Sequence, residues 1–384
     1  MDTALFLDIL NIDSTSGQEA ELADFLADRL VSPACRLVRF DNAGNVTSEV
    51  VDDRASNLMF VWGNPRVVFC THMDTVPPYF PSAIPIEHCD GGDSSTCTPN
   101  MISGRGTCDA KGQIMAMYEA CCKLEKRGCS DFALLLLTGE ETGSFGAKAF
   151  NRIADRILPS VSDAWLVVGE PTDNCMASAA KGTKAFEIEF NGVAFHSGYP
   201  QHGRSAVMMF NDFVNALRSI GFPYDETLGE TTWNIGRLQS DNPQNILSDS
   251  LTCRVYFRTT FESDEMVCNV MKNMAGPKAR LRFGRPMVQD GSDIVAKEIA
   301  DWQKFMKITP FGGDSPTRFD VLDGFQSKPV SFGSDAPQLT CFTHRILCGP
   351  GSILVAHRDD EHIRLEDIEK AAENYVKIYE QLKR

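Results

Sequence analysis

Apolar and polar positions follow two different periods along the chain. Short continuous apolar runs, typical of strands buried on both faces of a sheet, alternate with stretches in which apolar residues recur at helical spacing. The runs predict buried strands at residues 67–71, 132–138 and 164–168. The helical spacing predicts helices at residues 3–12, 17–30, 110–126, 144–157 and 365–384, and Ser14, Thr15 and Ser16 are candidate caps of the second helix. This alternation indicates an α/β fold with a mainly parallel sheet flanked by helices.

The pattern changes at about residue 176. Strands and helices then follow one another in the order β-α-β-β-α-β, which is the ferredoxin-like arrangement. The predicted strands lie at 184–190, 231–238, 250–259 and 279–283, and the predicted helices at 204–220 and 263–275. We therefore expect a small α+β domain, residues 176–287, inserted into a larger domain formed by residues 1–175 and 288–384.

Composition and charge narrow the classes of partner. The chain has 384 residues, 43% of them hydrophobic, and a net charge of −15. Nucleic acids and anionic membranes repel so acidic a protein, so we expect neither as a partner. The sequence shows no apolar run long enough to span a membrane and no secretory leader pattern, and its thirteen cysteines lack CxxC spacing. We expect a cytoplasmic protein with reduced thiols.

Side chains suited to holding a cation follow each predicted buried strand of the larger domain. These are His72 and Asp74, the adjacent pair Glu140 and Glu141, and Glu170; Asp109 precedes a helix, and His357 lies late in the chain. Ligands bind at the carboxyl ends of strands in open α/β sheets, so we expect these groups to converge. Buried carboxylates repel one another unless cations offset their charge.

The same residues divide into two metal sites. One histidine and one glutamate on each side of a shared aspartate predict that His72 and Glu170 hold one ion, His357 and Glu141 hold the other, and Asp109 lies between. Imidazole and carboxylate together suit zinc or a similar divalent ion.

Several blocks of the sequence resemble one enzyme family. THMDTVP, GRGTCDAKGQ, TGEETGS, VVGEPT, AFHSGYP and GPGS with a following AHRDDE are similar to the signature blocks of the dinuclear zinc amidohydrolases. That family includes acetylornithine deacetylase, succinyl-diaminopimelate desuccinylase, aminoacylase and glutamate carboxypeptidase. The resemblance implies a zinc-exopeptidase-like catalytic domain with two zinc ions, for which cobalt and manganese are alternatives, and an inserted lid through which the protein forms a homodimer.

The resemblance also implies individual roles. It supports the two metal sites named above, with Glu140 as the general base that takes a proton from water and Asp74 as the carboxylate that orients His72. Neighbouring side chains at the end of a strand point in opposite directions, so we expect Glu141 to face the metal and Glu140 the water. His196 resembles a lid histidine that stabilises the developing oxyanion in the active site of a partner subunit.

The substrate is expected to be a small N-acylamino acid. Arg258 resembles a lid arginine that binds a substrate carboxylate, and Asn245 matches a lid asparagine, although the proline and acidic residue usual after it are missing. Gly333 and Ile353 replace polar residues of the desuccinylase branch. Lys181-Gly182 fits the acetylornithine deacetylase branch, which favours an arginine-biosynthesis substrate.

Other functions stay open at this point. A dipeptidase, a carboxypeptidase and a succinyl-diaminopimelate desuccinylase use the same metal pair. A protein that binds an amino acid on this fold without catalysis would be expected to have lost Glu140 or a ligand, and none is lost. A nucleotide-binding enzyme is disfavoured, because TGEETGSFG is not GxGxxG and GxxxxGK[ST] does not occur.

Overall fold

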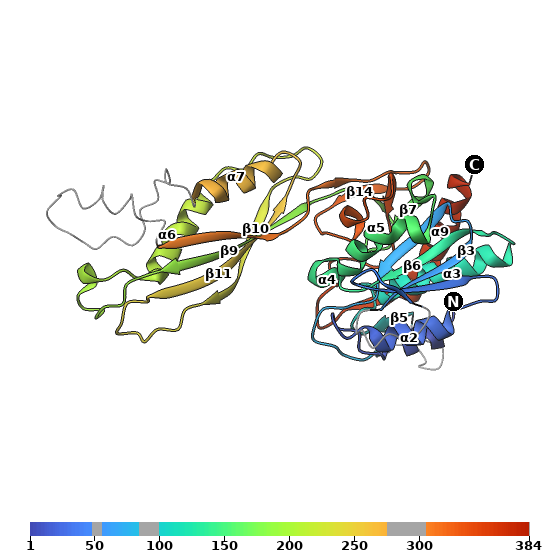
Figure 1. The fold of residues 1–384 in the computed structure, drawn as a ribbon, viewed down its shortest axis with the longest axis horizontal. Helices are drawn as coiled ribbons and strands as arrows, with labels where there is room; N and C mark the ends of the chain where they lie inside the picture. The colour runs from blue at the N-terminus through green and yellow to red at the C-terminus, as the bar shows by residue number, and fades with distance from the viewer. Residues whose placement is uncertain (48–55, 84–99, 275–304, 384) are drawn as a thin grey trace, which may run out of the picture. The chain divides into compact units, whose positions relative to one another are not determined.

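The computed structural model describes residues 1–47, 56–83, 100–274 and 305–383 (Figure 1). The chain divides into two compact units. Unit 1 consists of Met1–Ser178, Arg318–Lys328 and Ser334–Arg384, and unit 2 consists of Ala179–Thr317 and Pro329–Gly333.

Unit 1 is built on a seven-stranded sheet with the order β15-β7-β4-β6-β3-β1-β2. The strands are β15 (His344–Leu347), β7 (Trp165–Val168), β4 (Val67–His72), β6 (Asp131–Leu137), β3 (Ser56–Gly63), β1 (Arg36–Asp41) and β2 (Val46–Thr47). The first four strands are parallel to one another, and the last three add in antiparallel order. The carboxyl ends of the parallel strands therefore lie at one edge of the sheet.

Helices cover both faces of this sheet. They are α1 (Thr3–Leu10), α2 (Ala20–Arg29), α3 (Lys111–Lys126), α4 (Glu140–Gly143), α5 (Phe145–Ile157) and α9 (Leu365–Leu382), with the 3-10 turns η1 (Val161–Asp163) and η4 (Ala336–Gln338). Val67 and Phe69 belong to one hydrophobic core with α1, α2, α3 and α9. The intervening Val68 faces the other way and is also fully buried. The predicted α/β class is confirmed.

Unit 2 contains a four-stranded antiparallel sheet with the order β10-β11-β9-β12. Its strands are β9 (Gly182–Asn191), β10 (Thr232–Gln239), β11 (Ser250–Thr259) and β12 (Met306–Gly312), and its helices are α6 (Ala206–Arg218) and α7 (Asp264–Met274). Alternate residues of β11 are buried, and Val255 and Phe257 pack with Phe213 of α6 and Met271 of α7. The order of elements is β-α-β-β-α-β.

The second boundary of the insertion differs from the prediction. Unit 2 extends to Thr317 instead of ending at residue 287, because β12 returns to pair with β9 and completes the sheet. The strand predicted at 279–283 lies outside the described residues. A long-range pairing of this kind leaves no local signal that shows where the chain leaves a domain.

Smaller sheets complete the fold. One has the order β13-β8-β14, from β13 (Thr317–Arg318), β8 (Met176–Ala180) and β14 (Ser327–Val330), and another joins β16 (His362–Arg364) to β5 (Met101–Ser103). A 3-10 turn, η2, covers Pro200–His202. Among the described residues, no helix combines the length and the apolar character that a bilayer crossing requires. The cysteines of the described ranges are free thiols.

Candidate active site

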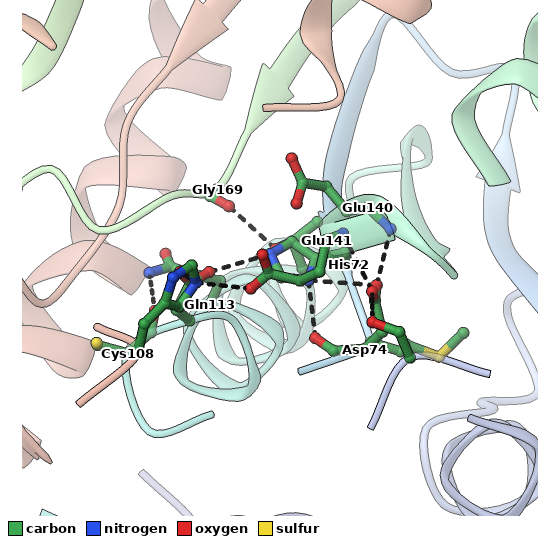
Figure 2. A network of polar contacts seen from close by, with 12 residues as sticks. His72, Asp74, Cys108, Gln113, Glu140, Glu141 and Gly169 are labelled. Carbon is green, nitrogen blue, oxygen red and sulfur yellow. Dashed lines mark hydrogen bonds and ion pairs between the residues drawn. The ribbon is translucent and has the colours of Figure 1, made fainter. Parts of the chain in front are cut away.

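Residues from separate loops meet at the carboxyl edge of the parallel strands in unit 1 (Figure 2). His72 is the last residue of β4, and Glu170 follows β7. Their ligand atoms lie within 4.8 Å of one another and of a carboxylate oxygen of Asp109, which precedes α3. A second group with the same spacing joins Asp109 to Glu141 and His357. Both predicted sets of ligands are thus brought together.

The carboxylate of Asp109 reaches both histidines. Its Oδ1 lies 3.1 Å from Nε2 of His72, and its Oδ2 lies 3.2 Å from Nε2 of His357. Burial raises the pKa of Asp109, but hydrogen bonds to His357 and His72 outweigh this and hold the pKa below its usual value. One aspartate with an oxygen directed to each side is the arrangement that a bridging ligand requires.

The pKa values of the other four ligands are all raised. Burial raises the pKa of Glu170 well above its ordinary value, and burial together with Asp109 raises the pKa of Glu141. Hydrogen bonds to Asp109 and Glu141, the latter 2.8 Å from Nε2, raise the pKa of His357 to about 10. Burial alone would lower the pKa of His72, but its contacts with Asp109 and Asp74 together outweigh burial and raise the pKa well above its ordinary value.

These shifts describe a site that attracts positive charge. Buried carboxylates outnumber the histidines, so protons are taken up where cations are absent. Divalent ions would supply that charge, and the mixed imidazole and carboxylate donors suit zinc. The residues therefore fit a pair of divalent metal ions.

The TGEE segment differs from the prediction in its backbone. Strand β6 ends at Leu137, and Glu140 and Glu141 are the first two residues of the one-turn helix α4. Their side chains diverge by the rotation of a helix, about 100° per residue, and not by the alternation of a strand. Gly139 adopts a left-handed conformation with φ 70° that makes this sharp turn possible.

Glu140 lies beside the metal ligands. Its carboxylate falls within 4.8 Å of ligand atoms of His72 and Glu141, and burial raises its pKa well above the ordinary value. In Figure 2 the Glu140 carboxylate projects away from the dashed contacts around His72, whereas Glu141 points toward them. Glu141 contacts His357, the histidine of its predicted ligand set.

Asp74 contacts His72 more closely through its backbone oxygen than through the carboxylate that was predicted to orient the histidine. The nearest partner of Nδ1 of His72 is the backbone oxygen of Asp74 at 2.9 Å, and the Asp74 carboxylate lies 3.5 Å away. That carboxylate accepts hydrogen bonds from the backbone N–H groups of Glu140 at 3.0 Å and Glu141 at 3.1 Å, and from Oγ of Ser16. Asp74 thus fixes the tautomer of His72, and it also fixes the turn that carries Glu140 and Glu141.

Three further residues support the site and were not predicted to do so: Ser16, Glu19 and Gln113. The predicted cap Ser16 donates to Asp74 instead of capping α2, and Glu19 accepts a hydrogen bond at 3.2 Å from the N–H of Gly139, directly before Glu140. Burial raises the pKa of Glu19 to about 7. The sequence signal was the density of serine, glycine and glutamate in STSGQE, which also occurs at ordinary helix starts.

Gln113 of α3 is the third of these residues. Its Nε2 donates at 2.8 Å to the backbone oxygens of both Cys108 and Pro350, which ties the loop before Asp109 to the GPGS loop (Figure 2). A Cβ at Gly349 would lie 2.1 Å from Oε1 of Gln113 and 2.7 Å from the backbone oxygen of Glu170, so only glycine fits there. This contact joins segments far apart in the chain and leaves no local pattern.

The predicted lid residues His196, Asn245 and Arg258 all belong to unit 2. The N–H of Ser197 donates to the backbone oxygen of Asn245 at 2.9 Å, so His196 and Asn245 lie in adjacent loops. The N–H of Gly198 donates to Nδ1 of His196 at 3.0 Å. In a neutral imidazole this leaves the proton on Nε2, and the exposed His196 is ready to donate a hydrogen bond.

Arg258 is not brought together with the other two lid residues. Strand β11 is paired with β9 along its whole length and runs from Ser250, next to the loop of Asn245, to Thr259. The strand between Ser250 and Arg258 spans about 27 Å at about 3.4 Å per residue. His196 and Arg258 of one chain are therefore too far apart to contact the same small substrate.

The chain matches a known family over most of its length. A model described as Peptidase family M20/M25/M40 matches residues 68–381. A probable carboxypeptidase of Aspergillus oryzae is 30% identical over 392 residues, which cover 97% of this chain and 85% of the relative. A probable carboxypeptidase of Aspergillus clavatus is 31% identical over 400 residues, covering 97% and 86%.

Solved structures share the fold at low sequence identity. A tripeptidase of Staphylococcus aureus superposes with a TM-score of 0.73 at 16% identity, covering 99% of this chain and 97% of that one. An M20 family metallo-carboxypeptidase of Sulfolobus solfataricus gives 0.66 at 15%, covering 100% and 99%. A dinuclear metal-binding peptidase of the M20 family from Bacillus subtilis gives 0.61 at 12%, covering 98% and 96%.

Proposed function

Because this chain belongs to peptidase family M20/M25/M40 and is a hydrolase of amide bonds, we propose that it releases an amino acid from its N-acyl derivative with the help of two divalent metal ions, most simply zinc. The observation that carries the proposal is the Asp109 carboxylate, with one oxygen directed to His72 and the other to His357. A general base, Glu140, stands beside them.

Each ion would have its own set of three ligands, and Asp109 would belong to both sets. His72, Asp109 and Glu170 would hold one, and Asp109, Glu141 and His357 the other. When bound, divalent cations polarise the scissile carbonyl and acidify water. Glu140 accepts a proton from the attacking water and returns it to the leaving amine. Asp74 keeps the backbone of Glu140 in place while this proton moves.

Substrate recognition is assigned to unit 2. The guanidinium of Arg258 lies 5.1 Å from the centre of the Tyr256 ring, and Gly333 is a neighbour of it, since a Cβ there would be in ordinary contact with Nη1 at 3.8 Å. Gly333 has no side chain that could bind the guanidinium, and the α-carboxylate of the substrate would bind it as a bidentate partner. The absence of a polar side chain at Gly333 and at Ile353 disfavours a second acyl carboxylate. An N-acetylated amino acid of the arginine pathway, such as N-acetylornithine, is the first substrate in this proposal.

A carboxypeptidase or dipeptidase is the second candidate. It is favoured by the relatives named probable carboxypeptidases and by the tripeptidase with a similar fold. Both candidates require a free α-carboxylate on the released amino acid and differ in the group on the other side of the amide. The fold alone does not separate them.

A substrate panel tests the choice. We expect purified protein with zinc to give its highest kcat/KM on N-acetylornithine or N-acetylcitrulline, with lower values on N-succinyl-diaminopimelate and on dipeptides. Arg258→Lys should raise KM for every carboxylate-bearing substrate more than it lowers kcat, because it removes ground-state and transition-state binding together. A clear preference for dipeptides would replace the deacetylase assignment with the peptidase.

We also propose that His196 acts in the active site of a second subunit in a homodimer formed through unit 2. The distance along β11 between its loop and Arg258 supports this, because a substrate carboxylate bound by Arg258 is out of reach of His196 in the same chain. The Nε2 proton of His196 would then stabilise the oxyanion on the partner's substrate.

Subunit mixing tests this arrangement. His196→Ala and Glu140→Gln should each be nearly inactive as homodimers, whereas mixed dimers contain one site with both residues intact. We expect mixing to restore up to about one half of the wild-type activity per mixed dimer, by the symmetry of a two-fold dimer. Unchanged activity after subunit exchange, shown by exchange of differently tagged chains, would place His196 and Glu140 in the same chain's site.

A further inference from the structure

A buried ion pair joins two segments that lie far apart in the sequence of unit 1. Nη1 of Arg105 lies 2.7 Å from Oε2 of Glu361, and the two side chains are 1% and 0% exposed. Neither residue was among those expected to act in the site. Burying such a pair costs desolvation, and an apolar pair of similar size is often as stable. Stability alone therefore does not account for it.

Glu361 accepts hydrogen bonds from the backbone of Asp109 and of the residue before it. Its Oε1 accepts hydrogen bonds from the N–H of Cys108 at 3.1 Å and from the N–H of Asp109 itself at 3.3 Å. Its backbone oxygen accepts from the N–H of Gly104 at 3.0 Å. The loop that presents Asp109 is thus attached to the segment that follows His357.

Arg105 holds that same segment from the other side. Its Nη1 donates at 3.2 Å to the backbone oxygen of Arg358, the residue directly after His357. Its Nε donates to the backbone oxygen of Pro78 at 3.2 Å, and its guanidinium lies 4.8 Å from the centre of the Phe80 ring. The guanidinium is therefore fixed in place and, in turn, fixes the loop of His357.

The rest of the site is held differently. His72 ends β4 and Glu170 follows β7, so parallel strands of the central sheet place both of them. His357 lies in an irregular loop, is about half exposed, with a side-chain exposure of 48%, and has a positive φ of 64°. Its position relative to Asp109 depends on contacts between the two loops.

We propose that Arg105 and Glu361 are a positioning pair that sets the separation of Asp109 and His357, and with it the affinity of the metal site that these two share with Glu141. The inference rests on the proposed two-metal function. Neither side chain touches substrate. Loss of the pair should weaken the site of His357 more than the site of His72, because strands hold the latter.

Metal titration of chelated protein tests the pair directly. Glu361→Gln and Arg105→Lys keep the size of each side chain and change its charge or its hydrogen-bonding geometry. By calorimetry with Zn²⁺ and by the absorption spectrum with Co²⁺, we expect one dissociation constant to rise about 10–100-fold, as is usual when a residue that supports a ligand is lost. The other should change by less than about threefold. Glu380→Gln, which removes the exposed pair with Arg127, is the control and should change neither.

A double-mutant comparison identifies which of the two metal sites is affected. In a His357→Ala background, which already lacks a ligand of that site, Glu361→Gln should produce little further loss of metal affinity. The inference is overturned if Glu361→Gln and Arg105→Lys lower the unfolding temperature of the chelated protein but leave both dissociation constants unchanged, since that result describes a merely structural pair. If one variant does not fold, the other still decides.

Failure of the inference and failure of the proposed function give different results. If wild-type protein binds two ions but cleaves no amide of the panel, the proposed substrate is wrong. The metal titration of the Arg105 and Glu361 variants then still tests the positioning pair. Wild-type protein that binds fewer than two ions refutes both.

Discussion

Glu140→Gln is expected to retain both metal ions and to lose about 10²–10⁴-fold in kcat, the range for removal of a general base. Glutamine has the shape of glutamate but cannot take a proton from water. The backbone N–H of residue 140 would still donate to Asp74, so the turn that carries the neighbouring ligand Glu141 should remain in place. The measurement is kcat and metal content on the same preparation, with N-acetylornithine or the best substrate of the panel.

Glu373→Gln provides the matched control for that variant. Glu373 is exposed on α9 and belongs to none of the candidate metal-binding groups, so its replacement should change neither kcat nor metal content. If Glu140→Gln retained wild-type kcat, Glu140 would not be the base. If it lost one ion, Glu140 would instead be a ligand, as its place near His72 and Glu141 allows.

Asp109→Asn is expected to reduce bound metal from about two ions to fewer than about one per chain, with activity lost in parallel. One carboxylate faces both histidines, so its neutralisation removes an anionic ligand from both sites at once. Glu141→Gln should weaken only the site of His357, because its carboxylate contacts that histidine. Metal analysis after dialysis against a dilute metal buffer distinguishes the two outcomes.

The comparison of these two variants is the informative part. Equal metal loss from Asp109→Asn and Glu141→Gln would show that Asp109 serves one site only. Circular dichroism of each chelated variant serves as the folding control, since removal of repelling carboxylates should not unfold the chain.

Elements with a strong local signal were predictable. The buried strands β4, β6 and β7 are continuous apolar runs, and α3, α5 and α9 carry one apolar face, so each was placed within a few residues. The antiparallel strands β1 and β3 were missed, although β3 is almost wholly buried. The return of β12 to the sheet of unit 2 was missed as well. Pairing with distant strands decided these elements.

The candidate site followed from a rule of topology. Polar residues at the carboxyl ends of parallel strands meet at one edge of the sheet. This rule alone predicted that His72, Glu141 and Glu170 lie close together, as they do. The supports of the site were not predictable in this way. Asp74 holding the N–H groups of the glutamate turn and Gln113 joining two loops both depend on backbone groups that no sequence pattern marks.

In the proposed function, two divalent ions share Asp109 and are both required for amide hydrolysis. This proposal is tested most directly by adding Zn²⁺ in known amounts to chelated wild-type protein while activity and bound metal are measured together. We expect binding to saturate at about two ions per chain and full activity to return only as the second ion binds. Full activity in the chelated protein, or saturation at a single ion, would contradict it.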